Sequence, residues 1–205
     1  MDMRNVLIVD DDEAILYSTS FMLRNAGFSV KTYSDGGSFL DDLESLAGQT
    51  CALLDVRMPG MDGISVLKEV RSRGVSLPII VLTGHGDVST AVSAMKAGAT
   101  DFLEKPYKKE TLLNSIEMGF QLLETSQTQL SQRQAAEARI SELTSRELDV
   151  LERLTDGLTN KAIAEDLGIS ARTVEIHRAN LMSKLNAETL SAALKIAFAA
   201  DLGST

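Results

Sequence analysis

Several apolar segments of the chain end in side chains that can take part in polar chemistry. Val6 to Val9, Ala52 to Leu54 and Ile79 to Leu82 are apolar throughout. A charged side chain is unfavourable inside a buried strand. Pro59-Gly60 indicates a turn shortly after Asp55. Asp55 is therefore expected where a strand leaves the core, and we interpret it as a nucleophile that accepts a phosphoryl group. The polar residues that follow the apolar segments are Asp10, Asp11, Asp12, Asp55, Thr83 and Lys105.

The types of these side chains predict a site for a divalent cation. Carboxylates that are held close together raise one another's pKa unless a counter-charge is bound. Oxygen ligands without histidine or cysteine favour Mg²⁺, which keeps some of its waters. A carboxylate can form an aspartyl-phosphate, with Lys105 neutralising one phosphoryl oxygen and Thr83 donating to another. Each residue also has a plainer interpretation: the acidic triplet as an exposed helix-starting turn, Thr83 as a strand end, Lys105 as a surface lysine.

Strand and helix signals alternate from residue 5 to residue 105. Phe28, Val30 and Thr32 alternate like a second strand, and residues 101–104 resemble a fifth. Continuous apolar runs are typical of parallel strands that are covered on both faces. The pattern of five strands and five helices predicts a doubly wound α/β domain with a five-stranded parallel sheet. Because ligands bind beyond the carboxyl ends of such strands, we expect the polar residues to meet at one rim.

The second part of the chain is predicted to be entirely helical. Residues 124–140 have almost no large apolar side chains and form either a polar helix or a flexible tether. Thr144 and Glu147 have the spacing of a capping box at the start of a helix. Four short helices are expected after residue 140. The predicted domains are therefore residues 1–123 and 141–205, joined by a linker at 124–140.

The segment 160–185 has the helix, glycine-containing turn and helix of a helix-turn-helix. The alternative is an ordinary α-hairpin. On a helical wheel of 171–185, Val174, His177, Leu181 and Leu185 share the core side. The side chains that face outward from this helix can contact DNA bases. Side chains near the starts of the two helices can contact DNA phosphates. The predicted DNA-contacting residues are Asn160, Lys161, Arg172, Thr173, Glu175, Ile176, Arg178, Ala179 and Lys184.

Composition limits the other possibilities. The 205 residues carry a net charge of -9, which argues against a broad nucleic-acid or anionic-membrane surface. Residues 140–205 contain seven Lys and Arg against ten Asp and Glu, so DNA binding by a monomer is expected to be weak. No segment is long and apolar enough to span a bilayer, and no signal peptide is expected. The single cysteine, Cys51, indicates a reduced, cytoplasmic protein.

The quoted residues resemble a known family along the whole chain. Asp10-Asp11, Asp55 with Met58-Pro59-Gly60, Thr83 and Lys105-Pro106 are similar to the receiver domain of bacterial two-component response regulators, which implies a flavodoxin-like fold. The stretches Gly157 to Ala164 and Thr173 to His177 resemble the LuxR-type output domain. The chain is thus identified as a FixJ-type member of the FixJ/NarL family.

The resemblance implies a role for each matching residue. Asp55 would be the phosphoacceptor, and Thr83 and Phe102 the switch residues. The metal ligands would be Asp10, Asp11, Asp55 and the backbone carbonyl of Arg57. A sensor histidine kinase would phosphorylate Asp55, and the phosphorylated protein would dimerise and bind promoter DNA, with RNA polymerase as a further partner. The protein would regulate transcription and would not be an enzyme acting on other substrates.

Three rival interpretations remain. An aspartate-nucleophile phosphatase would want a second acid two residues after the nucleophile, where this chain has Arg57. A flavin carrier of the same fold would want a phosphate-binding loop and aromatic rings that flank the flavin, and the chain has no Trp. A receiver whose helical tail binds protein or RNA is separated from the DNA-binding interpretation by salt-dependent binding to duplex promoter fragments.

Overall fold

The computed structural model describes residues 4–46, 48–84 and 88–203. The chain divides into two compact units, Met1–Thr125 and Ser126–Thr205. Each unit has its own hydrophobic core. No helix within the described ranges is both long and apolar enough to cross a membrane.

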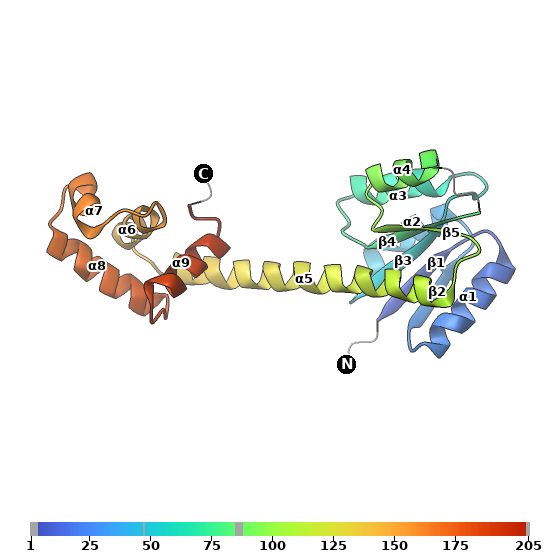
Figure 1. The fold of residues 1–205 in the computed structure, drawn as a ribbon, viewed down its shortest axis with the longest axis horizontal. Coiled ribbons are helices and arrows are strands. Elements are labelled where there is room, and N and C mark those ends of the chain that lie inside the picture. Colours follow the sequence, from blue (N-terminus) through green and yellow to red (C-terminus); the bar gives the residue numbers. More distant parts are fainter. Residues whose placement is uncertain (1–3, 47, 85–87, 204–205) are drawn as a thin grey trace. The chain divides into compact units, whose positions relative to one another are not determined.

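The first unit is built on a parallel sheet in the order β2-β1-β3-β4-β5 (Figure 1). This order confirms the predicted doubly wound fold, because the chain runs outward from β1 to one edge and then returns past it to the other. β3 is buried along its whole length, as its apolar sequence predicts. The strands are β1 Asn5–Val9, β2 Ser29–Tyr33, β3 Thr50–Asp55, β4 Ile79–Thr83 and β5 Asp101–Glu104.

Helices cover both faces of this sheet. Side chains of α2, α3 and α4, such as Phe39, Val66 and Ala94, pack on one face. Side chains of α1 and α5, such as Leu23 and Ile116, pack on the other. The helices are α1 Glu13–Asn25, α2 Gly36–Asp42, α3 Gly63–Ser72, α4 Val88–Lys96 and α5 Lys109–Ser141, with a short 3₁₀ helix, η1, at Leu43–Ser45.

Helix α5 extends through the segment for which the sequence left helix and tether open. The structure has a helix as far as Ser141. Arg133 and Glu137 form an (i, i+4) ion pair at 2.8 Å, a spacing that supports a helix. Ala136 is buried, and Ile140 packs against the core of the second unit. The C-terminal part of this helix is therefore held by apolar contacts as well as by propensity.

The second unit contains the expected short helices. Thr144 caps α6, and both hydrogen bonds of the predicted capping box with Glu147 are present. Gly168 has φ 65°, the left-handed conformation that ends α7 before the turn into α8. The buried side chains Ile163, Val174 and Leu181 join the helices in one core. The helices are α6 Ser145–Thr155, α7 Asn160–Leu167, α8 Ala171–Lys184 and α9 Leu190–Ala199.

Glu147 also forms an ion pair that the sequence did not indicate. Its carboxylate is 4% exposed, and its Oε2 lies 2.7 Å from the Nζ of Lys184. The same oxygen accepts from the backbone N–H of Thr144 at 2.8 Å. The ion pair joins the start of α6 to the end of α8. The hydrogen bond from Lys184, with the other contacts of this carboxylate, holds the pKa of Glu147 below its ordinary value.

Glu147→Gln is expected to reduce the free energy of unfolding by about 1–3 kcal/mol at pH 7, because Lys184 loses its charged partner. A lowered pKa stabilises the folded state above the ordinary glutamate range, and the benefit is lost as the pH falls through the folded-state pKa. The deficit of the variant should therefore shrink as the pH falls below about 4. Urea unfolding of the full-length protein across this pH range measures it. Glu142→Gln, at an exposed site, is the control; a deficit independent of pH would contradict the ion pair.

Candidate functional site

The carboxyl ends of adjacent strands bring the predicted polar residues to one rim of the first unit. Asp10 follows β1, Asp55 ends β3 and Thr83 ends β4. These three side chains are buried, with exposed fractions of 1%, 5% and 1%. β3 lies between β1 and β4, so Asp55 is the central member. The predicted convergence at this rim is therefore present.

Lys105 joins two of the carboxylates directly. Its Nζ lies 2.6 Å from Oδ2 of Asp10 and 2.5 Å from Oδ1 of Asp55. The other oxygen of each carboxylate accepts a backbone hydrogen bond, from the N–H of Asp12 at 3.0 Å and from that of Arg57 at 2.6 Å. The sequence placed Lys105 at the rim but did not predict that one ammonium would bridge both acids.

The electrostatics of this cluster follow from its burial. Burial raises the pKa of Asp55, and the nearby Asp10 raises it further. The hydrogen bonds from Lys105 and from the N–H of Arg57 lower it, but the pKa remains above its ordinary value. Burial lowers the pKa of Lys105, but its hydrogen bonds and attraction to Asp10 and Asp55 outweigh that effect and leave it raised. The ammonium is therefore charged at neutral pH. It offsets one of the two negative charges that the fold holds together.

The other predicted residues of this site have different surroundings. Asp11 is exposed next to the buried Asp10, and Asp12 caps α1 by accepting from the N–H groups of Ala14 and Ile15. The side chain of Arg57 is exposed. Phe102 is half-buried and packs against the core under α2, α3 and α4. Thus Asp10 and Asp55 each contact Lys105, while the side chains of Asp11 and Arg57 are exposed.

The chemistry of the oxygen groups at the rim suits Mg²⁺. Carboxylates and a backbone carbonyl are the ligands that this ion takes. Within the described part of the chain, however, no three acidic, His or Cys side chains are gathered into a ready metal cluster. The ammonium of Lys105 contacts both buried carboxylates. The residues fit the ion by type, and bound metal would share Asp10 and Asp55 with Lys105.

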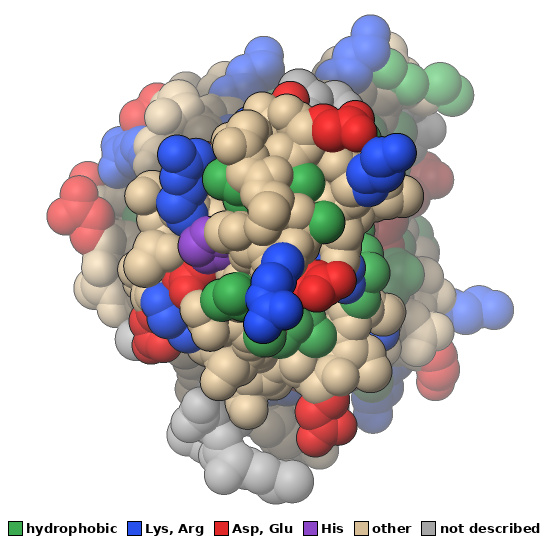
Figure 2. Space-filling model, turned by 90° about the vertical axis from the view of Figure 1, so that its left-hand side faces the viewer, with side chains coloured by type: hydrophobic (Ala, Val, Ile, Leu, Met, Phe, Trp, Pro, Cys, Tyr) green, Lys and Arg blue, Asp and Glu red, His purple; other side chains and the backbone are tan. Residues whose placement is uncertain are grey.

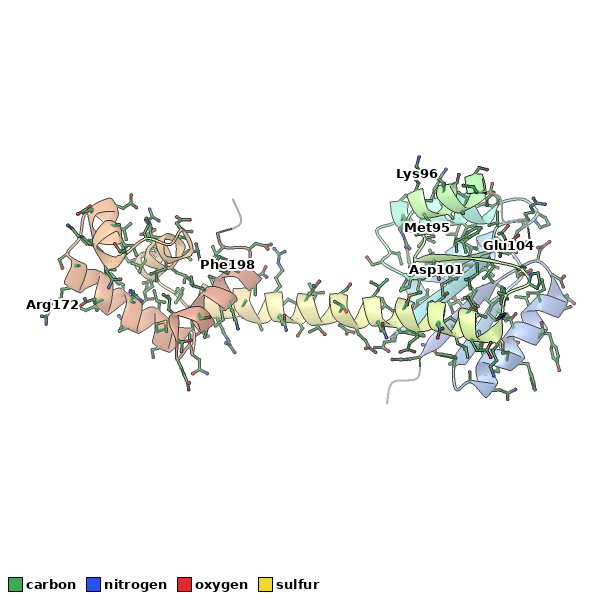
Figure 3. All side chains as sticks on the ribbon, viewed as in Figure 1. Met95, Lys96, Asp101, Glu104, Arg172 and Phe198 are labelled. Atoms are coloured by element: carbon green, nitrogen blue, oxygen red, sulfur yellow. The ribbon has the colours of Figure 1, made fainter. Side chains whose placement is uncertain are left out.

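The second unit presents one side of α8 to solvent. Val174, Leu181 and Leu185 are buried and His177 is half-buried, as the wheel predicted. Arg172, Glu175, Ile176 and Ala179 are exposed, and Ile176 has an exposed fraction of 54%. The side chain of Arg172 points away from the unit (Figure 3).

The remaining predicted DNA contacts differ in how they are held. Lys161 is exposed at the start of α7. Thr173 is half-buried, and its hydroxyl lies 2.8 Å from that of Ser170. Arg178 donates from Nη1 to Oδ1 of Asn160 at 2.5 Å.

Lys184 also has a partner within the second unit, a carboxylate of another helix. Its ammonium is paired with the buried carboxylate of Glu147, so we leave it out of the proposed phosphate contacts. The capping box revealed Glu147 in the sequence. Nothing in the spacing linked it to a lysine 37 residues further on.

The charges on this unit are mixed. Lys and Arg side chains are interspersed with Asp and Glu on its foremost surface in Figure 2, without a continuous basic patch. This agrees with the acidic composition of residues 140–205. The net charge of the whole unit therefore does not favour binding to nucleic acid.

Comparison with known proteins agrees with both parts of the fold. The family described as response regulator receiver domain matches residues 6–117, and the luxR family of bacterial regulatory proteins matches residues 141–197. These two matches define the class: a two-component response regulator with a LuxR-type DNA-binding domain.

Relatives similar over nearly the whole chain give the particular family. The transcriptional regulatory protein FixJ of Bradyrhizobium diazoefficiens is 42% identical over 97% of this chain and 96% of its own. FixJ of Rhizobium meliloti is 40% identical over 97% of each chain. The crystal structure of full-length FixJ from B. japonicum has a TM-score of 0.61 at 42% identity, covering 97% of both chains. The structure of the response regulator StyR has a TM-score of 0.75 at 40% identity, covering 96% of this chain and 98% of that one.

The chain belongs to the FixJ-like two-component response regulators. It is a transcriptional regulator and not an enzyme in the usual sense. Membership of this family implies a kinase partner and a DNA partner.

Proposed function

We propose that this regulator is controlled by phosphorylation of Asp55 by a sensor histidine kinase. The supporting observation is the bridge that Lys105 makes between Asp55 and Asp10 at the strand ends. In the transfer step, a carboxylate oxygen of Asp55 forms a bond to phosphorus. The bond from phosphorus to the kinase histidine breaks, and its electron pair stays on the imidazole nitrogen. Lys105 then neutralises one phosphoryl oxygen, and Thr83 donates a hydrogen bond to another.

Mg²⁺ is proposed as the cofactor of this step. Its ligands would be the carboxylates of Asp10, Asp11 and Asp55 and the backbone carbonyl of Arg57. When bound, the ion supplies charge neutralisation at the phosphoryl oxygens and a template for in-line attack. Asp11 is exposed and directly follows the buried Asp10 in the chain. Its recruitment would complete the set of ligands that the buried pair begins.

Lys105→Met is expected to make the protein less stable at pH 7 and more responsive to Mg²⁺. Without the ammonium, two buried carboxylates face each other unpaired, a loss of about 3–5 kcal/mol in comparable sites. Added Mg²⁺ restores the counter-charge without competing with Lys105. Thermal unfolding with EDTA and with Mg²⁺ should therefore show a larger rise in Tm for the variant than for the wild type. Lys96→Met is the surface control, and equal Mg²⁺ shifts in Lys105→Met and wild type would contradict the shared site.

The kinase is proposed to dock beside the same lysine. A groove lies between α1 and the segment after β5, lined by Ile15, Met22, Lys105, Pro106 and Tyr107 together with Ser18 and Thr19. Lys105 thus lines the groove and also contacts Asp55. A protein donor must bring its phosphohistidine to Asp55, so a helical segment of the kinase is the occupant that this position favours.

An exposed residue of the groove allows this docking to be tested. Ser18 lines the groove and is exposed on α1. Ser18→Arg places a bulky charged side chain in the groove and is expected to lower phosphotransfer from the kinase at least about 10-fold, a loss of about 1.4 kcal/mol in docking. Labelling by acetyl phosphate, which needs no docking, should not change. A parallel loss with both donors would place the effect at Asp55 itself and refute the docking surface.

Phosphorylation is proposed to act through α4 and β5. The negative charge on Asp55 draws Thr83 toward it, and Phe102 turns inward into the space that is left. Coupling of about 1–3 kcal/mol is typical of such switches. Small residues of α4 such as Ala94 face the core, while Val88, Val92 and Met95 are exposed.

This surface is proposed to pair with a second copy of the chain. Met95 and Lys96 lie on α4, which packs beside β5, the strand that ends at Glu104, so apolar and charged side chains lie on neighbouring elements (Figure 3). A two-fold pair could therefore match the Lys96 of each copy with acids of the other.

Paired output units would reach two DNA half-sites. Arg172 is proposed to read guanine, Ile176 and Ala179 to contact a thymine methyl, and Glu175 to accept from cytosine. Lys161, Thr173 and Arg178 are proposed as phosphate contacts, with Asn160 beside them. RNA polymerase is the further partner expected of a transcription factor. Because the proposed target of the protein is bacterial promoter DNA, we propose that it acts in the cytoplasm.

A further inference from the structure

Arg178 is held by a residue from another helix. Its Nη1 donates to Oδ1 of Asn160, the first residue of α7, which is 18 residues earlier in the chain. Both side chains are half-buried. The contact joins the two helices of the helix-turn-helix at the end where α7 begins.

Both ends of this hydrogen bond are rigidly supported. Thr159 caps α7 by accepting from the N–H of Ala162, and Ser170 caps α8 by accepting from that of Thr173. Ile163 and Val174 are fully buried in the same core. Neither partner can move far without disturbing a packed helix, so Asn160 gives Arg178 a fixed direction.

The chemical type of the partner distinguishes Arg178 from three other arginines of the second unit. Arg133 pairs with Glu137 and Asp201, Arg146 with Asp149, and Arg153 with Glu152 and Asp166. A carboxylate offsets the charge of each of these. The Asn160 carboxamide has no charge, so it orients the guanidinium without offsetting its positive charge, and among the described residues Arg178 forms no ion pair with a carboxylate. One N–H is used, and the planar group has others to donate.

An oriented, uncompensated guanidinium suits a phosphate. A free arginine loses side-chain entropy of up to about 2 kcal/mol when it is fixed on a ligand. Asn160 removes part of that loss before DNA arrives. An amide is also the partner that does this without lowering the electrostatic attraction, whereas a carboxylate at the same place would cancel it.

We propose that Asn160 is a positioning residue that holds the guanidinium of Arg178 for contact with a DNA phosphate. This inference rests on the proposed binding of duplex DNA. It changes the role of Asn160, which acts through Arg178 and not by its own contact with DNA.

A double-mutant cycle with a salt titration tests the inference. The probe is a labelled random-sequence DNA duplex, because a phosphate contact does not depend on sequence. Binding of the full-length protein is followed by fluorescence anisotropy at several salt concentrations. Arg178→Ala should weaken binding and reduce the slope of log K against log salt by about 0.9, the effect of one phosphate contact. Asn160→Ala should weaken binding about 3- to 10-fold with the slope unchanged, because the charge remains.

The combination of variants separates positioning from direct contact. In the Arg178→Ala background, Asn160→Ala should have no further effect. Asn160→Asp keeps the acceptor but adds a charge, so it should keep the Tm and still lower both the affinity and the salt slope, although the arginine is intact. Arg146→Ala, which removes an arginine already paired with Asp149, should bind like the wild type.

Two outcomes would overturn the proposal. Additive losses in the double variant would mean that Asn160 contacts DNA itself. Asn160→Asp binding like the wild type would mean that the charge of Arg178 does not act on DNA. If the wild type binds no duplex at any salt concentration, the proposed DNA-binding function fails as well, which distinguishes that failure from the other two.

Discussion

Asp55→Asn is expected to abolish labelling of the protein by acetyl phosphate and by a phosphorylated kinase. Asparagine has nearly the same shape as aspartate, but its amide nitrogen is not a nucleophile. Asp10 and Lys105 should keep their contact, so the variant is expected to fold. The measurement is the incorporation of radioactive phosphate into the full-length protein. Labelling of the variant should fall to the background level.

The control for this variant is a nearby carboxylate with another task. Asp62 is exposed and caps α3 by accepting from the N–H of Ser65 at 2.7 Å. Asp62→Asn keeps a side-chain oxygen for the cap and should be labelled like the wild type. Retained labelling of Asp55→Asn would refute the assignment of the phosphoacceptor and would point to another carboxylate at the rim.

Ile176→Glu is expected to lower the affinity for specific DNA by about 10- to 100-fold, the cost of one lost base contact. Ile176 lies on the exposed side of α8, between Arg172 and Ala179. Glutamate would remove the proposed apolar contact with a thymine methyl and bring a negative charge near the phosphates. Anisotropy titration with a fragment selected from genomic DNA by the wild-type protein measures the loss.

A matched surface substitution separates this effect from a change in fold. Leu130 on α5 has an exposed fraction of 55%, close to the 54% of Ile176. Leu130→Glu should therefore leave both the Tm and DNA binding unchanged, and Ile176→Glu should leave the Tm unchanged. If Ile176→Glu binds DNA like the wild type, the wrong side of the helix has been assigned to the base edges.

Much of the fold could be predicted because its signals are local. Continuous apolar runs marked β1, β3 and β4, and the alternation of strand and helix signals predicted a parallel sheet. A parallel sheet gathers its strand ends, so the meeting of Asp10, Asp55 and Thr83 followed from topology alone. The capping box at Thr144 and Glu147 was also confirmed, because it depends on only four consecutive residues.

The parts that could not be predicted depend on which side chains meet. Lys105 could have pointed along the rim; in the structure it bridges two acids. Lys184 was assigned to a phosphate from its place on the helix, but the end of α8 packs beside α6 and brings it to Glu147. Asn160 and Arg178 were expected to act separately, and only the packing of α7 on α8 shows their contact. In residues 124–140 the sequence left a helix and a flexible tether open. The burial of Ala136 stabilises the helix in a way that the residue types alone did not indicate.

The most direct test of the account is the DNA affinity of one protein before and after its phosphorylation. We predict that treatment with acetyl phosphate and Mg²⁺ tightens binding of the wild type to its selected fragment by about 5- to 150-fold, the range of 1–3 kcal/mol coupling. The same treatment should leave Asp55→Asn unchanged. Equal affinities for treated and untreated wild type, at full occupancy of Asp55 by mass spectrometry, would contradict the claim that a charge at the strand ends governs the helical unit.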